Sequence, residues 1–449
     1  AAGTAYASSP AGRALYGYIL LKNGMPTLAF ETLFQVSKPE AIPGELRALW
    51  AAAVSTENPI WLYADYKWKS SWQIVFGKDL QLRKGALENA SLKNARELKK
   101  AEQLLTRTTA HTPEWARLHW QLATSKAILD QNSQAQRHLQ TLLASKQKVI
   151  GRDQILMAIG RLHFQRNQFQ DALSAYNQVS KASDYWLEAL EEKAWTYIRL
   201  GDYRKALGQL ETVLTPVFAA ELGPEPYFVR SFSNLKICDF QSVFKTHDEF
   251  KSKYRQRTLD LQALAQTGQS PALSGALSKM MSGATRWSQF GPDVEKLPRF
   301  FHRDQSVDRL MQRARALAAE KTQLANLVAS VRDEYASTRM EDSLGRNQID
   351  MNNKIAAIQM AVTAKVRKLA NAELEEISRI LRKLHIVEAE SIQRLHLYDK
   401  DAARAETKFA DVGDSDTLVF PADGEVWLDE LDHYEVNAAG CPAPKKRGG

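Results

Sequence analysis

Small and apolar residues recur along residues 153–219 with a period of 34. The positions that repeat are Gly160 and Ala194, His163 and Tyr197, Phe169 and Tyr203, Ala172 and Ala206, Tyr176 and Leu210, and Val179 and Val213. Within each unit two small residues stand twelve apart, as two antiparallel helices require where they cross closely. The pattern therefore predicts a series of paired helices.

Weaker copies of the pattern extend it over residues 1–260. Gly17 and Ala29 form one pair near the start, and Ala123 and Ala135 form another. A last copy around Ser231 carries the larger Val243 at the second position, which is typical of a divergent or capping repeat. We therefore expect residues 1–260 to form one helical repeat domain.

The pattern changes after this domain. Residues 261–302 are rich in Gly, Ser and Pro, and predict a linker with one short helix at 272–281. Residues 303–412 lack proline and carry apolar residues at steps of three and four, typical of a coiled coil. We expect a long helical hairpin that turns at 340–347, near Gly345. One continuous helix that dimerises is the alternative.

The C-terminal segment 413–449 resembles neither repeat nor coil. Its "TLVF" at 417–420 predicts a short strand, and Trp427 and Leu431 need an apolar surface. We expect this tail to dock on the helical body. The fold class is then all-α, with an α-solenoid followed by a long helical hairpin and a small irregular tail.

Composition narrows the range of partners. The formal net charge is +8, which could favour anionic partners, but no dense Lys/Arg cluster occurs before residue 445. A solvated surface with a mild bias is the simpler interpretation, and no nucleic acid is expected. No apolar run reaches the roughly 18–20 residues that a membrane helix needs.

The sequence contains no recognisable catalytic or cofactor motif. His-Glu-x-x-His, Gly-x-Ser-x-Gly, a Walker-type phosphate loop and a dinucleotide-binding glycine fingerprint are all absent. The two cysteines, Cys238 and Cys441, lack the Cys-x-x-Cys spacing of a structural zinc site. We expect no enzyme activity, no cofactor and no metal.

The motif "RLGDYRKALGQL" at 199–210 and its 34-residue period resemble the tetratricopeptide repeat (TPR) family. In that family, four positions of the first helix of each repeat line a groove that binds an extended peptide or a helix. The resemblance places Met157, Arg161, Phe164, Glu191, Trp195 and Arg199 at such partner-binding positions. Packing of Phe164 and Trp195 against the next helices is the alternative.

The divergent last repeat, the long helical segment and the ending "VFPADGEVWLDELDHYEVNAAGC" resemble envelope-associated TPR proteins of gliding and predatory bacteria, including components of adventurous gliding motility. The resemblance implies a non-enzymatic scaffold, periplasmic or associated with the outer membrane, that joins other envelope proteins and approaches the cell wall or another anionic surface. The chain starts "AAGTAYASSP", without a signal peptide, which fits a mature N-terminus or a trimmed boundary. The alternatives are a cytosolic TPR adaptor assembled through its coiled coil and an enzyme subunit. The sequence leaves the oligomeric state open.

Export has a consequence for the two cysteines. An exported protein with two cysteines usually pairs them. A returning hairpin would also bring the tail back toward the last repeat, so we expect a disulfide between Cys238 and Cys441. In the alternative, Cys238 is a buried apolar residue and Cys441 is a free thiol.

Overall fold

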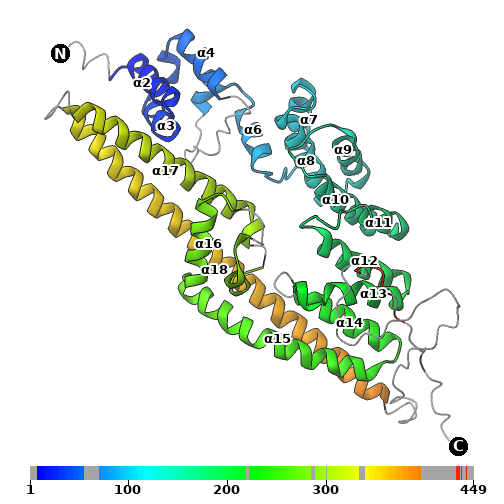
Figure 1. The fold of residues 1–449 in the computed structure, drawn as a ribbon. Helices are drawn as coiled ribbons and strands as arrows, with labels where there is room; N and C mark the ends of the chain where they lie inside the picture. The colour runs from blue at the N-terminus through cyan, green and yellow to red at the C-terminus, as the bar shows by residue number, and fades with distance from the viewer. Residues whose placement is uncertain are drawn as a thin grey trace, which may run out of the picture. The chain divides into compact units, whose positions relative to one another are not determined.

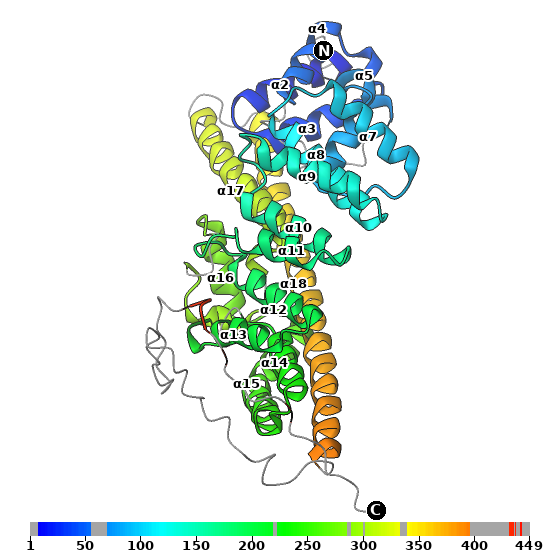
Figure 2. The same cartoon turned by 90° about the vertical axis from the view of Figure 1, so that its right-hand side faces the viewer.

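The computed structural model describes residues 8–54, 70–218, 222–284, 289–299, 301–332, 339–395, 431–434, 436 and 441 (Figures 1 and 2). Throughout these residues the regular elements are helices, and no strand occurs among them. The all-α prediction is confirmed at this level. None of the described helices combines the length and the apolar character that crossing a membrane requires.

The chain divides into two compact units, and each unit is built from segments that are distant in sequence. Unit 1 takes its described residues from Ala1–Ile155, Met280–Gly283 and Gln305–Val362. Its helices are α2 (Pro10–Lys22), α3 (Pro26–Phe34), η1 (Pro39–Ala41), α4 (Gly44–Ala53), η3 (Ser70–Trp72), α5 (Gln73–Phe76), α6 (Leu80–Leu87), α7 (Ala95–Arg107), α8 (Pro113–Ile128), α9 (Asn132–Ala144), α17 (Gln305–Arg332) and the first part of α18 (Arg339–Leu395).

Unit 2 takes its described residues from Leu156–Lys279, Ala284–Asp304 and Thr363–Gly449. It contains most of α10 (Arg152–Gln165) and α16 (Pro271–Met281), together with α11 (Phe169–Tyr176), α12 (Trp186–Leu200), α13 (Tyr203–Val213), η4 (Pro216–Phe218), α14 (Glu225–Lys236), α15 (Phe240–Thr267), η6 (Pro292–Lys296), η7 (Phe301–Arg303) and the rest of α18. The predicted domains were continuous stretches of chain, with boundaries at residues 260, 302 and 412. The two units are instead each assembled from three separate stretches of the chain. The predicted linker is also more helical than expected, because α15 continues to Thr267 and α16 fills the place of the predicted helix 272–281.

The core of unit 1 forms around Trp50. Its indole Nε1 donates to the carbonyl oxygen of Ala14 at 3.0 Å, and its ring lies 5.2 Å from that of Phe30. A Cβ on Gly17 would lie 2.8 Å from the carbonyl oxygen of Ala29, so α2 and α3 cross as closely as the spacing of these two residues predicts.

A buried carboxylate joins α17 to the start of α3. Glu320 is 1% exposed and accepts hydrogen bonds from the backbone N–H groups of Thr27, at 2.9 and 3.0 Å, and Leu28, at 3.4 Å. These N–H groups belong to the first turn of α3, where no carbonyl of the helix can accept from them. Burial raises the pKa of Glu320 to about 7, against the opposing effect of these hydrogen bonds.

The raised pKa of Glu320 predicts a pH-dependent stability of unit 1. Because the folded state binds the proton more tightly, the free energy of unfolding should fall as the pH rises from about 4.5 to about 7, by up to about 3 kcal/mol. Glu320→Gln keeps the shape and removes the titration, so it should flatten this part of the profile. Glu45→Gln, at an exposed position of α4, is the control. Urea titrations at several pH values measure the free energy of unfolding of both chains. If it fell equally with pH in the native chain and in Glu320→Gln, Glu320 would not be the group that titrates.

The predicted helix pairs are present in unit 2. Ala172, Ala194 and Ala206 are fully buried at the positions where the spacing predicts close crossings. The turn between α12 and α13 contains Gly201 in the left-handed conformation, with φ of 78°, and Asp202 caps α13 by accepting from the N–H of Lys205 at 3.1 Å. The local structure follows the repeat pattern, and membership of the TPR family stays a prediction.

Gly160 offers a direct test of one predicted crossing. A Cβ at this position would lie 2.3 Å from the ring of Tyr176, which is buried. Gly160→Ala should therefore lower the free energy of unfolding by about 1–3 kcal/mol, although alanine favours helices. Gly275→Ala, in α16 with open space around it, should raise the free energy of unfolding by about 0.5–1 kcal/mol. Chemical denaturation measures the free energy of unfolding of both variants. An equal change in Gly160→Ala and Gly275→Ala would contradict the close approach of Tyr176 to Gly160.

Helix α18 packs against α15 along the C-terminal part of its length. Contacts join His247 to Glu388, Arg257 to Glu373, and the carbonyl of Ala265 to Arg367, so the two helices run antiparallel (Figures 1 and 2). The hairpin prediction instead expects this part of α18 to pack against the preceding helix, α17. However, α17 has 28 residues, or ~42 Å, whereas α18 has 57, or ~86 Å, and α17 is too short to cover it.

Within unit 1, α17 and the first part of α18 share a core. Leu324 and Met351 are both fully buried in the cluster that contains Trp50. The predicted turn at 340–347 is wrong, because α18 begins at Arg339 and Gly345 lies inside the helix. A glycine inside a helix is tolerated at a modest cost in free energy, so Gly345 alone does not end the helix.

The described residues of the tail lie against unit 2. Leu431 is buried, and its carbonyl accepts from Lys181 Nζ at 3.1 Å. Asp432 pairs with the same ammonium at 2.8 Å, and its N–H donates to Thr212 Oγ1 at 2.8 Å. Cys441 forms a disulfide with Cys238, with Cα atoms 5.0 Å apart. The predicted strand at 417–420 and Trp427 lie outside the described residues.

Candidate functional site

The six residues that the sequence assigns to partner binding have different environments in unit 2. Met157 is only 1% exposed, so it belongs to the core and offers no surface to a partner. This part of the groove assignment is wrong, because the side chain points into the interior of the helical array. The other five residues are at least partly accessible.

The two arginines of the predicted groove are engaged by neighbouring helices. Arg161 of α10 donates from Nε to Glu192 of α12 at 2.7 Å. Arg199 donates to Asn167 Oδ1 at 2.9 Å, and its guanidinium lies 5.6 Å from the ring centroid of Phe164. The helices therefore hold both cations and the Phe164 ring in fixed positions on the surface.

Trp195 has an aromatic neighbour on α14. Its ring centroid lies 5.9 Å from that of Phe228. The ammonium of Lys383, from α18, lies over the Phe228 ring at 4.6 Å, a cation–π geometry. Helix α18 thus reaches the surface that the sequence assigned to a partner.

Glu191 is the predicted groove residue with the most unusual electrostatics. Burial raises its pKa to about 8, although the guanidinium of Arg299 acts in the opposite direction. Glu225 and Glu376 raise the pKa further, because each adds negative charge nearby. These four residues, Glu191, Glu225, Arg299 and Glu376, are called the Glu191 cluster below. They come from α12, α14, the segment before η7 and α18.

The Glu191 cluster adjoins an open cavity of about 750 Å³ on α18. Glu376 belongs to both, and Arg299 Nη2 lies 3.3 Å from its Oε1. Burial is also the main cause that raises the pKa of Glu376. The residues that line the cavity are Asn371, Ala372, Leu374, Glu375, Glu376, Ser378, Arg379 and Arg382. The combination of this cavity with carboxyl groups of raised pKa makes it the candidate site.

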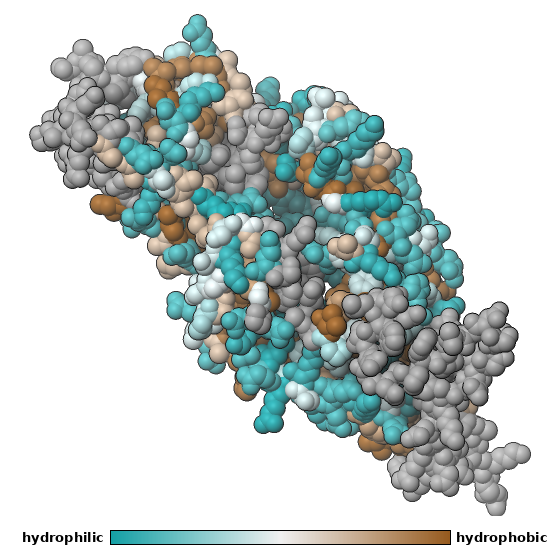
Figure 3. All heavy atoms as spheres, in the orientation of Figure 1, coloured by the Kyte–Doolittle hydropathy of each residue, from teal (hydrophilic) through white to brown (hydrophobic). Residues whose placement is uncertain are grey.

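The described surface is mainly polar on the face drawn in Figure 3. Hydrophilic residues cover most of it, and apolar residues form small separate patches. Large exposed apolar side chains, such as Ile128, Val217 and Met360, lie far apart in the sequence.

Sequence reasoning identified Glu191 but missed its neighbours. Arg299 lies in the segment predicted as a linker, and Glu376 lies in the segment predicted as a long helical hairpin, where no motif marks it. Neither has a local motif, because the cluster forms only when α18 packs in unit 2. Arg299 is one of six charged residues within 261–302, so nothing in the sequence distinguishes it.

Comparison with family models, with curated proteins and with solved structures gives no match.

Proposed function

We propose that the chain is a non-enzymatic protein–protein interaction scaffold of the bacterial cell envelope, and that it binds a partner segment at the cavity beside the Glu191 cluster. The observation that carries this proposal is the combination of the cavity with two carboxyl groups, Glu191 and Glu376, whose pKa values burial raises. Such groups are costly to keep ionised without an adequate counterion, and a cationic partner would supply one.

The charges of the cluster favour a basic side chain as the group recognised. The Glu191 cluster contains three carboxyl groups and one guanidinium, that of Arg299, which pairs with Glu376, and Arg379 also acts on Glu376. A lysine or arginine from a partner helix or extended segment would compensate the excess acid, and Glu191 would release its proton on binding. Arg379 and Arg382 on the cavity wall would pair with acidic residues elsewhere on the same segment.

Two observations support a location in the envelope, either periplasmic or at the outer membrane. Structural disulfides persist in oxidising compartments, and the chain pairs Cys238 with Cys441. The likeness of the C-terminal motif to envelope-associated TPR proteins points the same way. A cytosolic adaptor would not be expected to keep this disulfide, because thiols in the cytosol are held reduced.

Site-specific photo-crosslinking in cells tests the proposal. A photoreactive amino acid at Ser378, which lines the cavity, should crosslink a discrete envelope protein with a basic segment. The same group at Gln393, exposed on α18 but outside the cavity, is the matched control. The Ser378 crosslink should weaken in Glu191→Gln and Glu376→Gln backgrounds.

Three outcomes would contradict the proposal. Equal crosslinking from Ser378 and Gln393 would show that contact is not specific to the cavity. A crosslink that is insensitive to both glutamine substitutions would exclude charge recognition by the cluster. A cytosolic partner would favour the adaptor alternative.

A further inference from the structure

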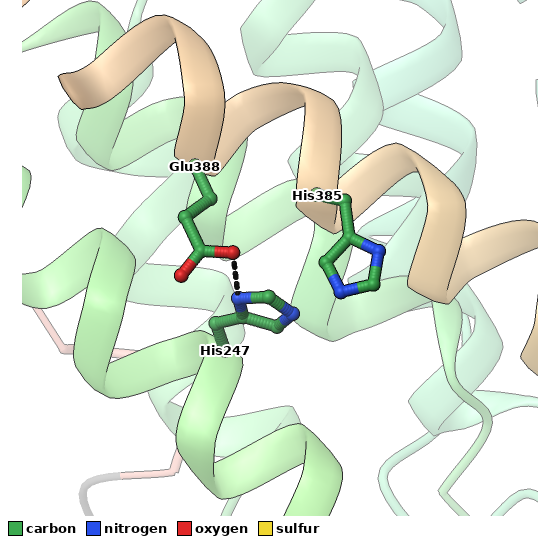
Figure 4. Close-up of side chains that lie close together, drawn as sticks. All are labelled: His247, His385 and Glu388. Carbon is green, nitrogen blue, oxygen red and sulfur yellow. Dashed lines mark ion pairs between the residues drawn. The ribbon is translucent and has the colours of Figure 1, made fainter.

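Three side chains with metal-ligating atoms meet where α15 packs on α18. His247 comes from α15, and His385 and Glu388 come from α18 (Figure 4). His247 Nδ1 lies 2.6 Å from Glu388 Oε2, and the two imidazole centroids are 4.8 Å apart. One ligand atom from each residue lies within 4.8 Å of the other two.

Helix geometry explains why these groups converge. His385 and Glu388 are three residues apart, which places them on one face of α18. The antiparallel packing of α15 then brings His247 against that face. His247 is 1% exposed, and its Nε2 has no hydrogen-bond partner within the described part of the chain. A buried ring nitrogen without a partner is uncommon, and a bound ion would satisfy it.

We propose that His247, His385 and Glu388 bind a divalent transition-metal ion, with Zn²⁺ as the best match. Two imidazoles and one carboxylate are the ligands of three-residue zinc sites, in which water takes the fourth position. Ca²⁺ and Mg²⁺ prefer ligand sets made of oxygen atoms alone. His247 Nδ1 and Glu388 Oε2 are now at hydrogen-bond distance, closer than two ligands of one Zn²⁺ ion, so these side chains must adjust on binding.

The surroundings hold the three ligands on a rigid frame and leave one side open. Val243, one turn before His247, and Val387, next to Glu388, share a buried cluster with Cys238 of the disulfide. The Glu388 side chain is 30% exposed, and His385 is exposed, so an ion and its water can enter from solvent. A bound ion would cross-link α15 to α18 within unit 2.

Zinc titration of the full chain, untagged and with its disulfide intact, tests this site. We expect one equivalent of Zn²⁺ to bind and to raise the melting temperature. His385→Gln and Glu388→Gln should each weaken Zn²⁺ binding by at least about 100-fold, because each removes a ligand. Both positions are accessible, so folding should survive, and circular dichroism checks this. Both cysteines are in the disulfide, so thiols do not compete for the ion.

The matched control is a second histidine pair in unit 1. His119 and His138 face each other, with their Nδ1 atoms 3.0 Å apart. His138→Gln should leave both the stoichiometry and the affinity unchanged. Three results would overturn the site: absence of Zn²⁺ binding by the native chain, native affinity in both α18 variants, or loss of binding in His138→Gln alone.

Discussion

Replacing Cys441 with serine is expected to lower the free energy of unfolding of unit 2 by up to about 5 kcal/mol. The disulfide joins residues separated by 203 positions, so its loss releases a very large loop in the unfolded chain. The chain-entropy model gives about 5 kcal/mol for a loop of this size, and measured values are often smaller. Urea unfolding of the native and variant chains under non-reducing conditions measures the difference.

Reduction provides the control for Cys441→Ser. Because Cys441 is exposed, serine at this position leaves no cavity, whereas Cys238 is 7% exposed and packs with Phe240 and Val243. A reductant should lower the unfolding midpoint of the native chain to that of Cys441→Ser and leave the variant unchanged. Hydrogen exchange should accelerate in the tail contact at Lys181 and Asp432. Equal midpoints in the oxidised state would show that the disulfide does not stabilise the fold.

The local helix pairs could be predicted because small residues limit how closely helices approach. Gly160 is closely approached by the Tyr176 ring, and Ala194 and Ala206 are fully buried. Gly160 and Ala194 are 34 residues apart, and Ala206 follows Ala194 by twelve. Asp202 after Gly201 adds a turn and a cap at the expected place. These signals lie within a few turns of each other along the chain, so the sequence contains both sides of each contact.

The long-range packing could not be predicted in the same way. The apolar stripe of α18 shows which of its faces is buried, but it does not identify the helix that covers it. The sequence order favoured α17, whereas α15 covers the C-terminal part. Met157 illustrates the related error, because a position taken from a family pattern says nothing of what packs over it.

Polar contacts between residues distant in the sequence could not be predicted, for a further reason. Glu320 meets the start of α3 from almost three hundred residues away, and His247 meets Glu388 across 141 positions. Charged and histidine side chains occur throughout helical sequences, so a buried one cannot be told from an exposed one by its type. Only the packing of the helices separates the two.

Removing one member of the Arg257–Glu373 pair is expected to destabilise unit 2 by about 3–5 kcal/mol. Arg257 Nε lies 2.6 Å from Glu373 Oε1, and the two side chains are only 14% and 6% exposed. Arg257 also donates to the carbonyl of Leu297 at 3.2 Å, and Glu373 accepts from the N–H of Arg299 at 2.7 Å. The pair therefore links α15, α18 and the segment around residues 295–299 through hydrogen bonds.

A double-mutant cycle measures the interaction energy between Arg257 and Glu373 apart from their contacts with other residues. Arg257→Met and Glu373→Leu each leave one buried charge without its partner, so each alone should be strongly destabilising. The double variant removes both charges and should recover a large part of the loss, because apolar replacements of a buried pair are often tolerated. Asp293→Asn breaks the exposed pair with Lys296 on the neighbouring η6 helix and should leave the unfolding midpoint unchanged within error. If the changes in the free energy of unfolding from the two single substitutions simply added in the double variant, the two charges would not be coupled. The packing of α15 on α18 would then depend on contacts other than this pair.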